Sequence, residues 1–411
     1  MKLPKPPTLS ELSPDSISPV FLSYLQQHPA TDHKGRYLSW EAFRHRYPTD
    51  SKQRWLAQKL NRQAIMQQIT LCDYRLSYCL PHDLQSKLYH IEQHYHQWQW
   101  SIDTEELLFE EPITSAQLEG ASTTRKVAKE LLGSGRKPLD KSETMIVNNY
   151  RLMQSAKQNL NQPLSIELIL QLHQIATDGA IDNGAVAGEF RQDDDIVIAD
   201  YDGQTIHQPP AWQQLPVLMQ AYCDFANQNN PDDGFIHPII KAVILHFLLG
   251  FIHPFGDGNG RTARALFYWF LQKSGYEHFD YISISRLLYK APKQYAQSYI
   301  DTETDGLDMT YFIAYQLIVI SRAITDLQNL LQEKEAPVSA NLVKDFNSLS
   351  IHQHHLLKNT PHDQVLTARQ VSIDLGISDS TARKLLNELE SFGLATTVRN
   401  GRGKGYLLVK V

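Results

Sequence analysis

The chain has 411 residues, with 39 Lys and Arg against 45 Asp and Glu, so its formal net charge is −6. A chain of this length exceeds what one compact core usually organises, and two or three domains are expected. The acidic balance argues against a protein that coats nucleic acid over its whole surface, although a local basic patch is compatible with it. The hydrophobic fraction of 42% is ordinary for a globular protein.

The apolar runs of the sequence are too short to cross a membrane. The longest, residues 242–252, is interrupted by His246 and Gly250, whereas a membrane span needs about 18–20 apolar residues. The first residues contain Lys and Pro but no apolar core of a signal peptide. The three cysteines lack CxxC spacing, so neither a disulfide framework nor a zinc site is indicated. We therefore expect a cytoplasmic protein that does not contact membranes.

Residues 1–103 are predicted to form a helical domain of unknown role. Residues 1–20 are rich in Pro and Ser and are expected to be disordered. Across residues 38–100, apolar and aromatic residues recur every three or four positions, as is typical of helices. His90 and His94 have the spacing of a metal pair, but no third ligand accompanies them, so we interpret them as part of a polar helix face.

Residues 104–332 are predicted to form a second, mainly helical domain that contains one β-hairpin. Helical patterns cover residues 142–159, 165–176, 216–227, 238–252, 262–273, 281–299 and 309–333. The β-branched run Ile196-Val197-Ile198 meets residues 205–207 across Asp202-Gly203, which is a hairpin signal. A single hairpin in a helical domain suits a flap over a site better than a core strand.

Residues 333–340, with Pro337, are predicted to form a linker to a separate module at residues 341–411. That module has a helix–turn–helix pattern followed by two strands around an Asn-Gly turn, which is the plan of a winged helix. Acidic residues in its second helix leave a protein-binding module open as an alternative to DNA binding. Its candidate DNA contacts are Arg383, Lys384, Arg399, Arg402 and Lys404.

The densest group of polar residues lies in the loop and helix start at residues 252–264. Gly258, Asn259 and Gly260 begin a helix, so backbone N–H groups there are free to bind an anion, and the helix dipole favours it. Arg261 and Arg264 are three positions apart and are predicted to grip further phosphate oxygens. The loop is therefore predicted to bind phosphates.

Two further residues give this loop a reaction chemistry. Asp257 is placed to hold a divalent cation that bridges phosphates. His253 is able to be neutral at pH 7 and to take a proton from an attacking hydroxyl. An EF-hand loop is excluded because Arg261 and Thr262 occupy its fifth and sixth positions, where a ligand and a glycine are required. A Walker A loop is excluded because no Gly-Lys-Ser/Thr follows. His246 is interpreted as a buried, hydrogen-bonded core histidine.

The stretch from His253 to Arg264 resembles the signature of the Fic (Fido-fold) family at every motif position. The resemblance extends over residues 104–332 and includes the hairpin as the family's flap. It implies that ATP binds with its phosphates in this loop. It further implies that a Ser, Thr or Tyr hydroxyl of a target protein attacks the α-phosphate, so that AMP is transferred and pyrophosphate leaves.

The resemblance also implies a role for each residue of the motif. His253 would be the general base and Asp257 the ligand of Mg²⁺ or Mn²⁺. Asn259 with the amides of its neighbours would hold the α-phosphate, and both arginines would hold the β- and γ-phosphates. Tyr295 would line the adenine pocket, and the flap run at residues 196–198 would align the target segment. The implied phosphate-binding residues are Gly256, Asp257, Gly258, Asn259, Gly260, Arg261 and Arg264.

The segment Ser115-Ala-Gln-Leu-Glu119-Gly120 resembles the inhibitory motif of the same family. On the residues alone, Thr114 or Ser115 is predicted to cap a helix with Glu119 in its first turn, over residues 114–122. The resemblance implies that Glu119 pairs with Arg264 and occupies the place of the γ-phosphate.

The expected fold is therefore mainly α, with a Fido-type catalytic domain between a helical N-terminal domain and a winged helix-turn-helix. The expected activity is protein adenylyl transfer, inhibited by Glu119. Two alternatives stay open: removal of AMP by the same site, and a DNA-binding or adaptor protein that modifies only itself. The expected partners are a target protein, the chain itself and DNA, and a homodimer is compatible with the sequence.

Overall fold

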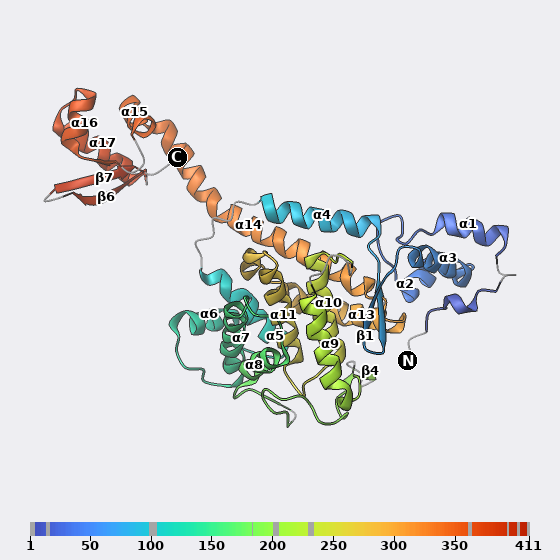
Figure 1. The fold of residues 1–411 in the computed structure, drawn as a ribbon. Helices are drawn as coiled ribbons and strands as arrows, with labels where there is room; N and C mark the ends of the chain where they lie inside the picture. Colours follow the sequence, from blue (N-terminus) through green and yellow to red (C-terminus); the bar gives the residue numbers. More distant parts are fainter. Residues whose placement is uncertain are drawn as a thin grey trace. The chain divides into compact units, whose positions relative to one another are not determined.

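The computed structural model describes residues 5–13, 17–97, 105–182, 184–199, 205–228, 234–360, 364–392, 394–400 and 403–408. The chain divides into two compact units, residues 1–327 and 328–411 (Figure 1). Unit 1 is mainly helical and contains two short β-hairpins, whereas unit 2 combines three short helices with a three-stranded sheet. Among the described helices, none is both long and apolar enough to cross a bilayer.

Two consecutive helices, α10 (Pro238–Ile252) and α11 (Asn259–Lys273), form the centre of unit 1. Every residue from 239 to 249 is buried, because α10 is apolar on all sides and helices of that kind lie inside a protein. The loop that joins α10 to α11 is the predicted phosphate loop. The surrounding helices are α5 (Glu110–Leu118), α6 (Arg125–Ser134), α7 (Lys141–Gln158), α8 (Ile166–Thr177), α9 (Leu215–Asn227), α12 (Ser285–Lys290), α13 (Pro292–Thr304) and α14 (Thr310–Ser348).

The helix ends of unit 1 follow from local sequence signals. The Asp140 and Ser165 side chains accept the N–H of the third residue of α7 and α8, which satisfies one free donor at each start. The single helix predicted over residues 281–299 is wrong. It is divided into α12 and α13, because Pro292 has no N–H to continue α12 and takes the first position of α13 instead.

The predicted flap hairpin is present. Strand β3 (Ile198–Ala199) pairs antiparallel with β4 (Thr205–His207), and Ile198 lies opposite His207. The predicted turn at Asp202-Gly203 lies outside the described residues. The flap therefore has two very short strands, and its position depends on the residues at its base.

The N-terminal part of unit 1 contains a second hairpin that the sequence analysis missed. It has the helices α1 (Pro19–Gln27), α2 (Trp40–Arg46), α3 (Ser51–Gln63) and α4 (His82–Gln97). Between α3 and α4, however, β1 (Gln67–Leu71) pairs antiparallel with β2 (Tyr74–Tyr78). Alternate residues of these strands are buried, a period of two that is too short to stand out among helical repeats.

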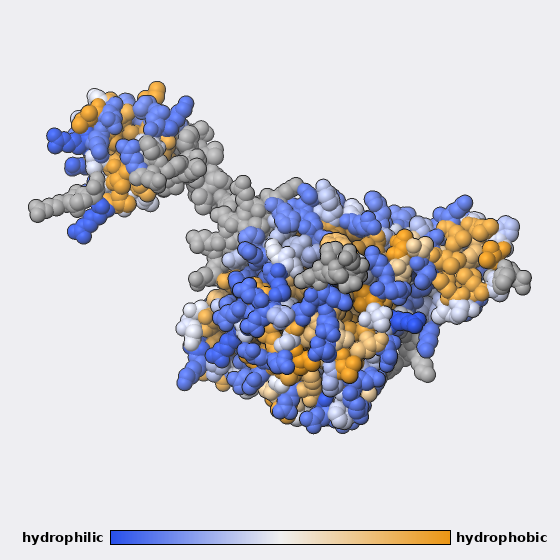
Figure 2. Space-filling model, in the orientation of Figure 1, coloured by the Kyte–Doolittle hydropathy of each residue, from blue (hydrophilic) through white to orange (hydrophobic). Residues whose placement is uncertain are grey.

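The expectation that residues 1–20 are disordered is wrong for residues 5–13 and 17–20. Leu9 and Leu12 pack against a cluster that contains Phe21 and Leu56, and the indole nitrogen of Trp55 donates to the carbonyl oxygen of Pro7. Burial of these apolar side chains offsets the entropy of ordering the segment. An apolar patch nevertheless remains exposed over α1 (Figure 2), formed by Ile17, Val20 and Leu22.

Arg62 connects the N-terminal helices to the start of α14. Its fully buried guanidinium donates to the carbonyl oxygens of Ala30 and Leu38 and to the Tyr311 hydroxyl. It also lies 3.6 Å from the centre of the Tyr37 ring. Burial disfavours the charge, but the surrounding tyrosine and aspartate groups raise the pKa of Arg62 overall. The N-terminal helices are therefore fixed to the start of α14.

Unit 2 has its own apolar core around Val371, Leu386, Leu389 and Tyr406. Gly376, in the left-handed conformation at φ 64°, ends the first helix of the predicted helix–turn–helix. The elements are α15 (Ile351–Asn359), β5 (Val365–Leu366), α16 (Ala368–Leu375), α17 (Asp379–Ser391), β6 (Ala395–Asn400) and β7 (Gly403–Leu408), with strand order β5-β7-β6.

Helix α14 continues through residues 333–340, where an irregular linker was predicted. The prediction gave weight to Pro337, which disfavours a helix interior. Residues 327–336, however, consist mainly of Leu, Gln, Glu, Lys and Ala, which favour the helical conformation. The connection between the two units is therefore helical.

Replacement of Arg62 by Met is expected to lower the free energy of unfolding of unit 1 by about 3–5 kcal/mol, because buried hydrogen-bond acceptors lose their cation. All six tryptophans lie before residue 270, so tryptophan fluorescence during urea unfolding reports on unit 1 alone. Arg44→Met removes an exposed ion pair with Glu41 and serves as the control. Equal midpoints for the two variants would contradict the anchoring role of Arg62.

Candidate functional site

His253 lies directly after α10 in a left-handed backbone conformation that residues other than glycine rarely adopt. It caps the helix at φ 49° and ψ 58°, and its N–H donates to the carbonyl oxygen of Leu249 at 2.9 Å. Its Nδ1 faces the carbonyl oxygen of Gly250 at 3.3 Å, and because a carbonyl only accepts, Nδ1 carries the hydrogen. Burial lowers the pKa of His253 from 6.5 to about 4. The neutral ring thus has its lone pair on Nε2, as a general base requires.

Glycines let the loop pass close to its neighbours. Gly258 has φ 79°, and a Cβ there would lie 2.7 Å from the Thr177 side chain. A Cβ on Gly256 would lie 2.6 Å from the Cβ of Ala185. The first hydrogen bond within α11 runs from the Thr262 N–H to the Gly258 carbonyl, so the preceding N–H groups have no helical acceptor. Those of Asn259, Gly260 and Arg261 are available to an anion, whereas the Gly258 N–H donates to Asp257.

The Asn259 side chain shapes the loop in this structure. Its Oδ1 accepts from the N–H of Phe255 at 3.0 Å, and its Nδ2 donates to the carbonyl oxygen of the same residue at 2.7 Å. The side chain is buried. Of the groups predicted at the α-phosphate, the side-chain amide of Asn259 is thus already bound within the loop, and the Gly258 N–H donates to the Asp257 carboxylate.

Asp257 and Arg261 lie together at the side of the loop that faces α8. Asp257 accepts from the N–H groups of Asp182 and Gly258, at 3.0 and 2.6 Å. Arg261 is buried, donates to the carbonyl oxygen of Ala176 at 2.7 Å and contacts Asp257 at 3.4 Å. It was predicted to grip phosphate beside Arg264, but here it is bound to the end of α8. The Asp257 carboxylate keeps 24% of its surface exposed.

Arg264 meets the predicted inhibitory segment. Its side chain is 1% exposed and donates from Nε to the Ser115 hydroxyl at 2.8 Å and from Nη2 to the Ser115 carbonyl oxygen at 3.1 Å. Nη2 also pairs with the Glu119 carboxylate at 2.9 Å. That carboxylate lies against the backbone of Gly260, where a Cβ would be 2.1 Å from its oxygen. The Glu119 carboxylate is thus bound at the start of α11.

The helix that carries Glu119 is placed differently from its prediction. Ser115 does not cap α5 but lies inside it, and Glu119 is its last, C-terminal capping residue. Gly120 follows at φ 98°, and the Ala121 N–H donates back to Ala116, which is a glycine helix stop. The helix therefore spans residues 110–118 instead of 114–122. A carboxylate at a helix C-terminus is disfavoured by the dipole, so Glu119 depends on Arg264 for stabilisation.

Helix α5 is fixed from its other end. The buried Glu111 carboxylate accepts from the hydroxyls of Ser283 and Ser285 and from the Ser285 N–H. Burial raises the pKa of Glu111, although these bonds and the charge of Arg264 oppose the shift. Burial likewise opposes the charge of Arg264, but the negative charges of Glu119 and Glu111 raise its pKa overall.

Tyr295 lies on α13 beside Arg264. Its hydroxyl contacts His246 Nε2 at 2.8 Å and the Tyr299 hydroxyl at 3.5 Å, while part of its surface stays exposed. His246 is buried and hydrogen-bonded as predicted, and burial lowers its pKa to about 3. The predicted adenine-pocket residue is thus a partly exposed aromatic side chain whose hydroxyl contacts the buried His246 of α10.

Arg191 was missed by the sequence analysis and connects the flap to the loop after α10. Its side chain is 2% exposed and donates to the carbonyl oxygens of His253 and Pro210. It also donates to the carbonyl oxygen of Asp193 and pairs with Asp194 at 2.8 Å. Both ends of the flap and the backbone of His253 therefore meet at one guanidinium. Arg191 lies 62 positions from His253, so no local pattern could indicate this contact.

His173 on α8 is a second residue that the sequence analysis missed. Its Nε2 donates to the carbonyl oxygen of Asp257 at 2.8 Å, its Nδ1 accepts from the Gly188 N–H at 3.0 Å, and its ring stacks on Phe255 at 3.7 Å. Burial lowers the pKa of His173 to about 4. This neutral histidine orients the backbone of the predicted metal ligand.

The predicted flap residues lie near the loop. Ile196 approaches within 3.7 Å of the Cβ position of Gly256. Val197 is 43% exposed, and Ile198 pairs with His207, although its side chain lies outside the described part. An exposed, partly paired strand edge of this kind is able to pair with an extended segment.

The candidate DNA contacts lie in unit 2. Arg383 and Lys384 are exposed on α17, and Arg399 is exposed on β6. Lys404 pairs with Glu390 at 2.9 Å, so part of its charge is neutralised. Arg402 lies outside the described residues.

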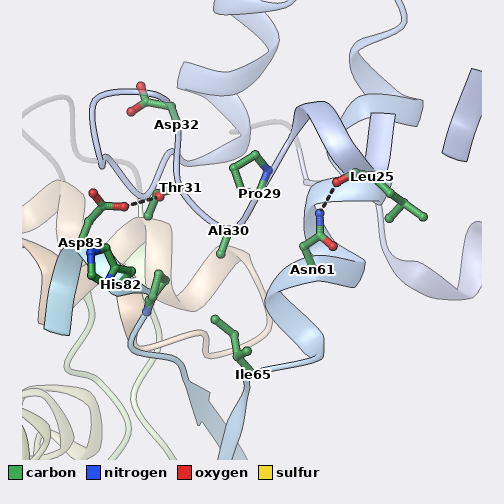
Figure 3. A pocket seen from close by; sticks show the side chains of 10 residues that line it. Leu25, Pro29, Ala30, Thr31, Asp32, Asn61, Ile65, His82 and Asp83 are labelled. Carbon is green, nitrogen blue, oxygen red and sulfur yellow. Dashed lines mark hydrogen bonds between the residues drawn. The ribbon is translucent and has the colours of Figure 1, made fainter. Parts of the chain in front are cut away.

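A hollow in the N-terminal helices does not resemble a reactive site (Figure 3). Four of its polar side chains are bound within the protein: Thr31 donates to Asp83, Asn61 donates to the Leu25 carbonyl oxygen, and Asp32 pairs with Arg46. These contacts indicate a structural role. Within the described residues, no group of three His, Cys, Asp or Glu side chains is arranged to hold a metal ion.

Comparison with known proteins finds similarity in the part of the chain that contains α10, α11 and the loop between them. Residues 163–271 match the model of the Fic/DOC family. The chain is similar to proteins named protein adenylyltransferase Fic, at 27% identity over 177 residues in Nematostella vectensis and 31% over 177 residues in Drosophila willistoni. Each alignment covers 42% of this chain, but only 39% and 33% of the relative.

The fold is shared with a solved Fic family protein from Desulfovibrio desulfuricans. The two structures superpose with a TM-score of 0.55 over 79% of this chain and 95% of that one, at 17% sequence identity. The predicted mainly helical, Fido-type fold is therefore confirmed.

The buried histidines make stability depend on pH. His173 and His246 have folded-state pKa values of about 4 and 3, below the usual 6.5, so the unfolded chain binds protons first as the pH falls. Their contribution is complete above pH 6.5 and is lost toward pH 4, by about 1.4 kcal/mol per pH unit for each group. We expect His246→Gln to flatten the pH dependence of the urea midpoint below pH 6.5 relative to the unmodified chain.

Proposed function

We propose that this chain, whose residues 163–271 match the Fic/DOC family, is a protein adenylyltransferase that transfers AMP from ATP to a hydroxyl of a target protein. The observation that carries the proposal is the bound carboxylate at the start of α11. Glu119 pairs with Arg264 beside Gly260, so this position accepts an anion at a helix N-terminus. The γ-phosphate of ATP is the anion that would replace it.

The residues of the loop fit a nucleotide with its phosphates along the start of α11. The free N–H groups of the first turn and Arg264 would hold phosphate oxygens. Tyr295, partly exposed beside Arg264, would contact the adenine ring. The Asn259 side chain would reach the α-phosphate only by giving up one of its bonds to Phe255.

A magnesium ion also fits this site. Mg²⁺ is commonly held by one or two carboxylates together with substrate phosphates and waters, so the single, partly exposed Asp257 is sufficient. His173 and Asp182 would keep Asp257 in place through its carbonyl oxygen and its carboxylate. When bound, the ion would neutralise charge on the phosphates.

His253 would act as the base. The hydroxyl oxygen of the target would form a bond to the α-phosphorus while its proton passes to His253 Nε2, and the bond to the β-phosphate oxygen would break to release pyrophosphate. The target would be held in an extended form against Ile196, Val197 and Ile198 of the flap. Because such pairing uses main-chain groups, the flap would select little by sequence. A cytoplasmic location, where ATP is available, belongs to the same proposal.

Glu119 would inhibit the transfer. One guanidinium nitrogen of Arg264 binds the Glu119 carboxylate, so Glu119 and the γ-phosphate compete for it. The two bonds from Arg264 to Ser115 remain when Glu119 leaves, so the arginine keeps its orientation for ATP.

Glu119→Gly is expected to increase labelling of the protein by [α-³²P]ATP and Mg²⁺ by about tenfold or more, since a competing pair worth about 1.4 kcal/mol corresponds to a factor of ten. Glu110→Gln removes a different ion pair on α5, with Arg125, and is the matched control. His253→Ala in the Glu119→Gly background should abolish labelling.

Three outcomes would contradict parts of this proposal. Labelling that does not change with Glu119→Gly argues against inhibition, and labelling that survives His253→Ala argues against the assigned base. Release of AMP from a modified protein that depends on Glu119 would favour removal of AMP by the same site.

A second candidate function concerns unit 2, which we propose to be a winged helix that binds duplex DNA. The favouring observation is charge: residues 328–411 carry ten Lys or Arg against eight Asp or Glu, a net +2, whereas the whole chain is −6. Exposed Arg383 on α17 and Arg399 on β6 would face phosphates or bases.

Charge reversal at Arg383 and Arg399 together should weaken binding of a random-sequence 20-base-pair duplex by about tenfold or more, measured by fluorescence anisotropy. Binding by the unmodified chain should fall steeply between 50 and 200 mM salt, as phosphate contacts require. Arg44→Glu, in unit 1, is the control. Absence of salt-dependent binding would leave protein binding as the role of unit 2.

A further inference from the structure

His207, the last residue of the flap strand β4, joins three elements around the site. Its ring is 5% exposed. Nε2 contacts the carbonyl oxygen of Phe251, in the last turn of α10, at 2.7 Å. Nδ1 contacts the Glu303 carboxylate on α13 at 2.6 Å. The flap, the helix that ends at His253 and the helix that carries Tyr295 therefore meet at one imidazole.

The two contacts define the number of protons at this position. A carbonyl oxygen accepts only, and so does an ionised carboxylate, whereas a neutral imidazole has one N–H to donate and an imidazolium has two. Both distances are short enough for charge-assisted hydrogen bonds. Both bonds are thus retained only when the pair of His207 and Glu303 holds one additional proton. The C-terminus of α10 and the carboxylate both favour a cation, which assigns that proton to the imidazole.

We infer that His207, as an imidazolium held by Glu303, is a positioning residue for the catalytic His253, an inference that rests on the proposed function. Phe251, whose carbonyl it binds, precedes His253 by two residues. Arg191 binds the carbonyl oxygen of His253 itself at 3.0 Å. Two cationic side chains, one from each side of the flap, thus satisfy carbonyl groups at the end of α10 that the helix leaves free.

This arrangement has two effects on the reaction. It connects the flap to the turn in which His253 adopts its left-handed conformation, so the segment that aligns the target and the base share one support. It also places positive charge near His253. Burial lowers the pKa of His253 to about 4, and the charges of His207 and Arg191 act in the same direction. His253 therefore keeps the neutral form that accepts a proton.

The protonation state is tested by NMR of the full-length protein with ¹⁵N-labelled histidine at pH 7.5. The signal of His207, identified by its loss in His207→Gln, should show both nitrogens protonated. In Glu303→Gln it should change to a neutral ring with hydrogen on Nε2 alone. His45 and Glu41 form an exposed pair at 2.8 Å, and their signal is followed in the same spectra as the reference for a solvent-exposed pair. A neutral His207 in the unmodified protein overturns the inference.

The positioning role is tested by self-labelling with [α-³²P]ATP in the Glu119→Gly background. His207→Gln and Glu303→Gln should each lower turnover by about ten- to a hundredfold, as displaced catalytic groups do, while KM for ATP changes less than about twofold. The double variant should lose no more than either single variant, because the pair acts as one unit. Unchanged turnover, or additive losses, overturns the positioning role. Absence of labelling in Glu119→Gly itself would contradict the proposed function, while the NMR result still decides the protonation state.

Discussion

The site depends on one constraint: the guanidinium of Arg264 is almost fully removed from water and must be matched by acceptors inside the protein. Ser115 supplies two of these acceptors, Glu119 supplies a third, and the buried Glu111 carboxylate adds negative charge. An unpaired charge in such a position would cost several kcal/mol. The close approach of α5 to the start of α11 follows from this requirement, and so does the absence of a side chain at Gly260, where the carboxylate lies.

A second set of contacts positions His253, the proposed base. His253 follows α10, an apolar helix whose residues 239–249 are buried in the core. The packing of α10 therefore fixes the backbone position of His253. Arg191, which precedes the flap, and His207, at the end of β4, bind carbonyl groups of the same turn. Polar groups at a helix end would otherwise face water, and here they are satisfied by cations. The fold thereby brings His253, the loop that follows it and the flap to one helix end.

The sequence indicated which groups gather where the site residues lie close together in the chain. His253, Asp257, Gly260 and Arg264 fall within twelve residues, and the structure places them in the loop after α10 and the first turns of α11. Arg261 shows the limit of that reasoning. Its separation from Arg264 by three positions does not indicate that its guanidinium donates to the carbonyl oxygen of Ala176. Arg191, His173 and Glu303 act across 62 to 96 positions, and the hairpin at residues 67–78 alternates over too few residues to be recognised.

Helix α5 ends at Glu119, and this determines how the site would open. The helix is fixed by Glu111 and by Asn149, which donates to the carbonyl oxygen of Pro112. Glu119, by contrast, is the terminal residue, and 33% of its side chain is exposed. Opening thus requires rotation of one side chain and no displacement of a helix. In the proposed switch, the apparent affinity for ATP would equal the intrinsic affinity multiplied by the open fraction, so any contact that draws Glu119 toward solvent would act as an activator.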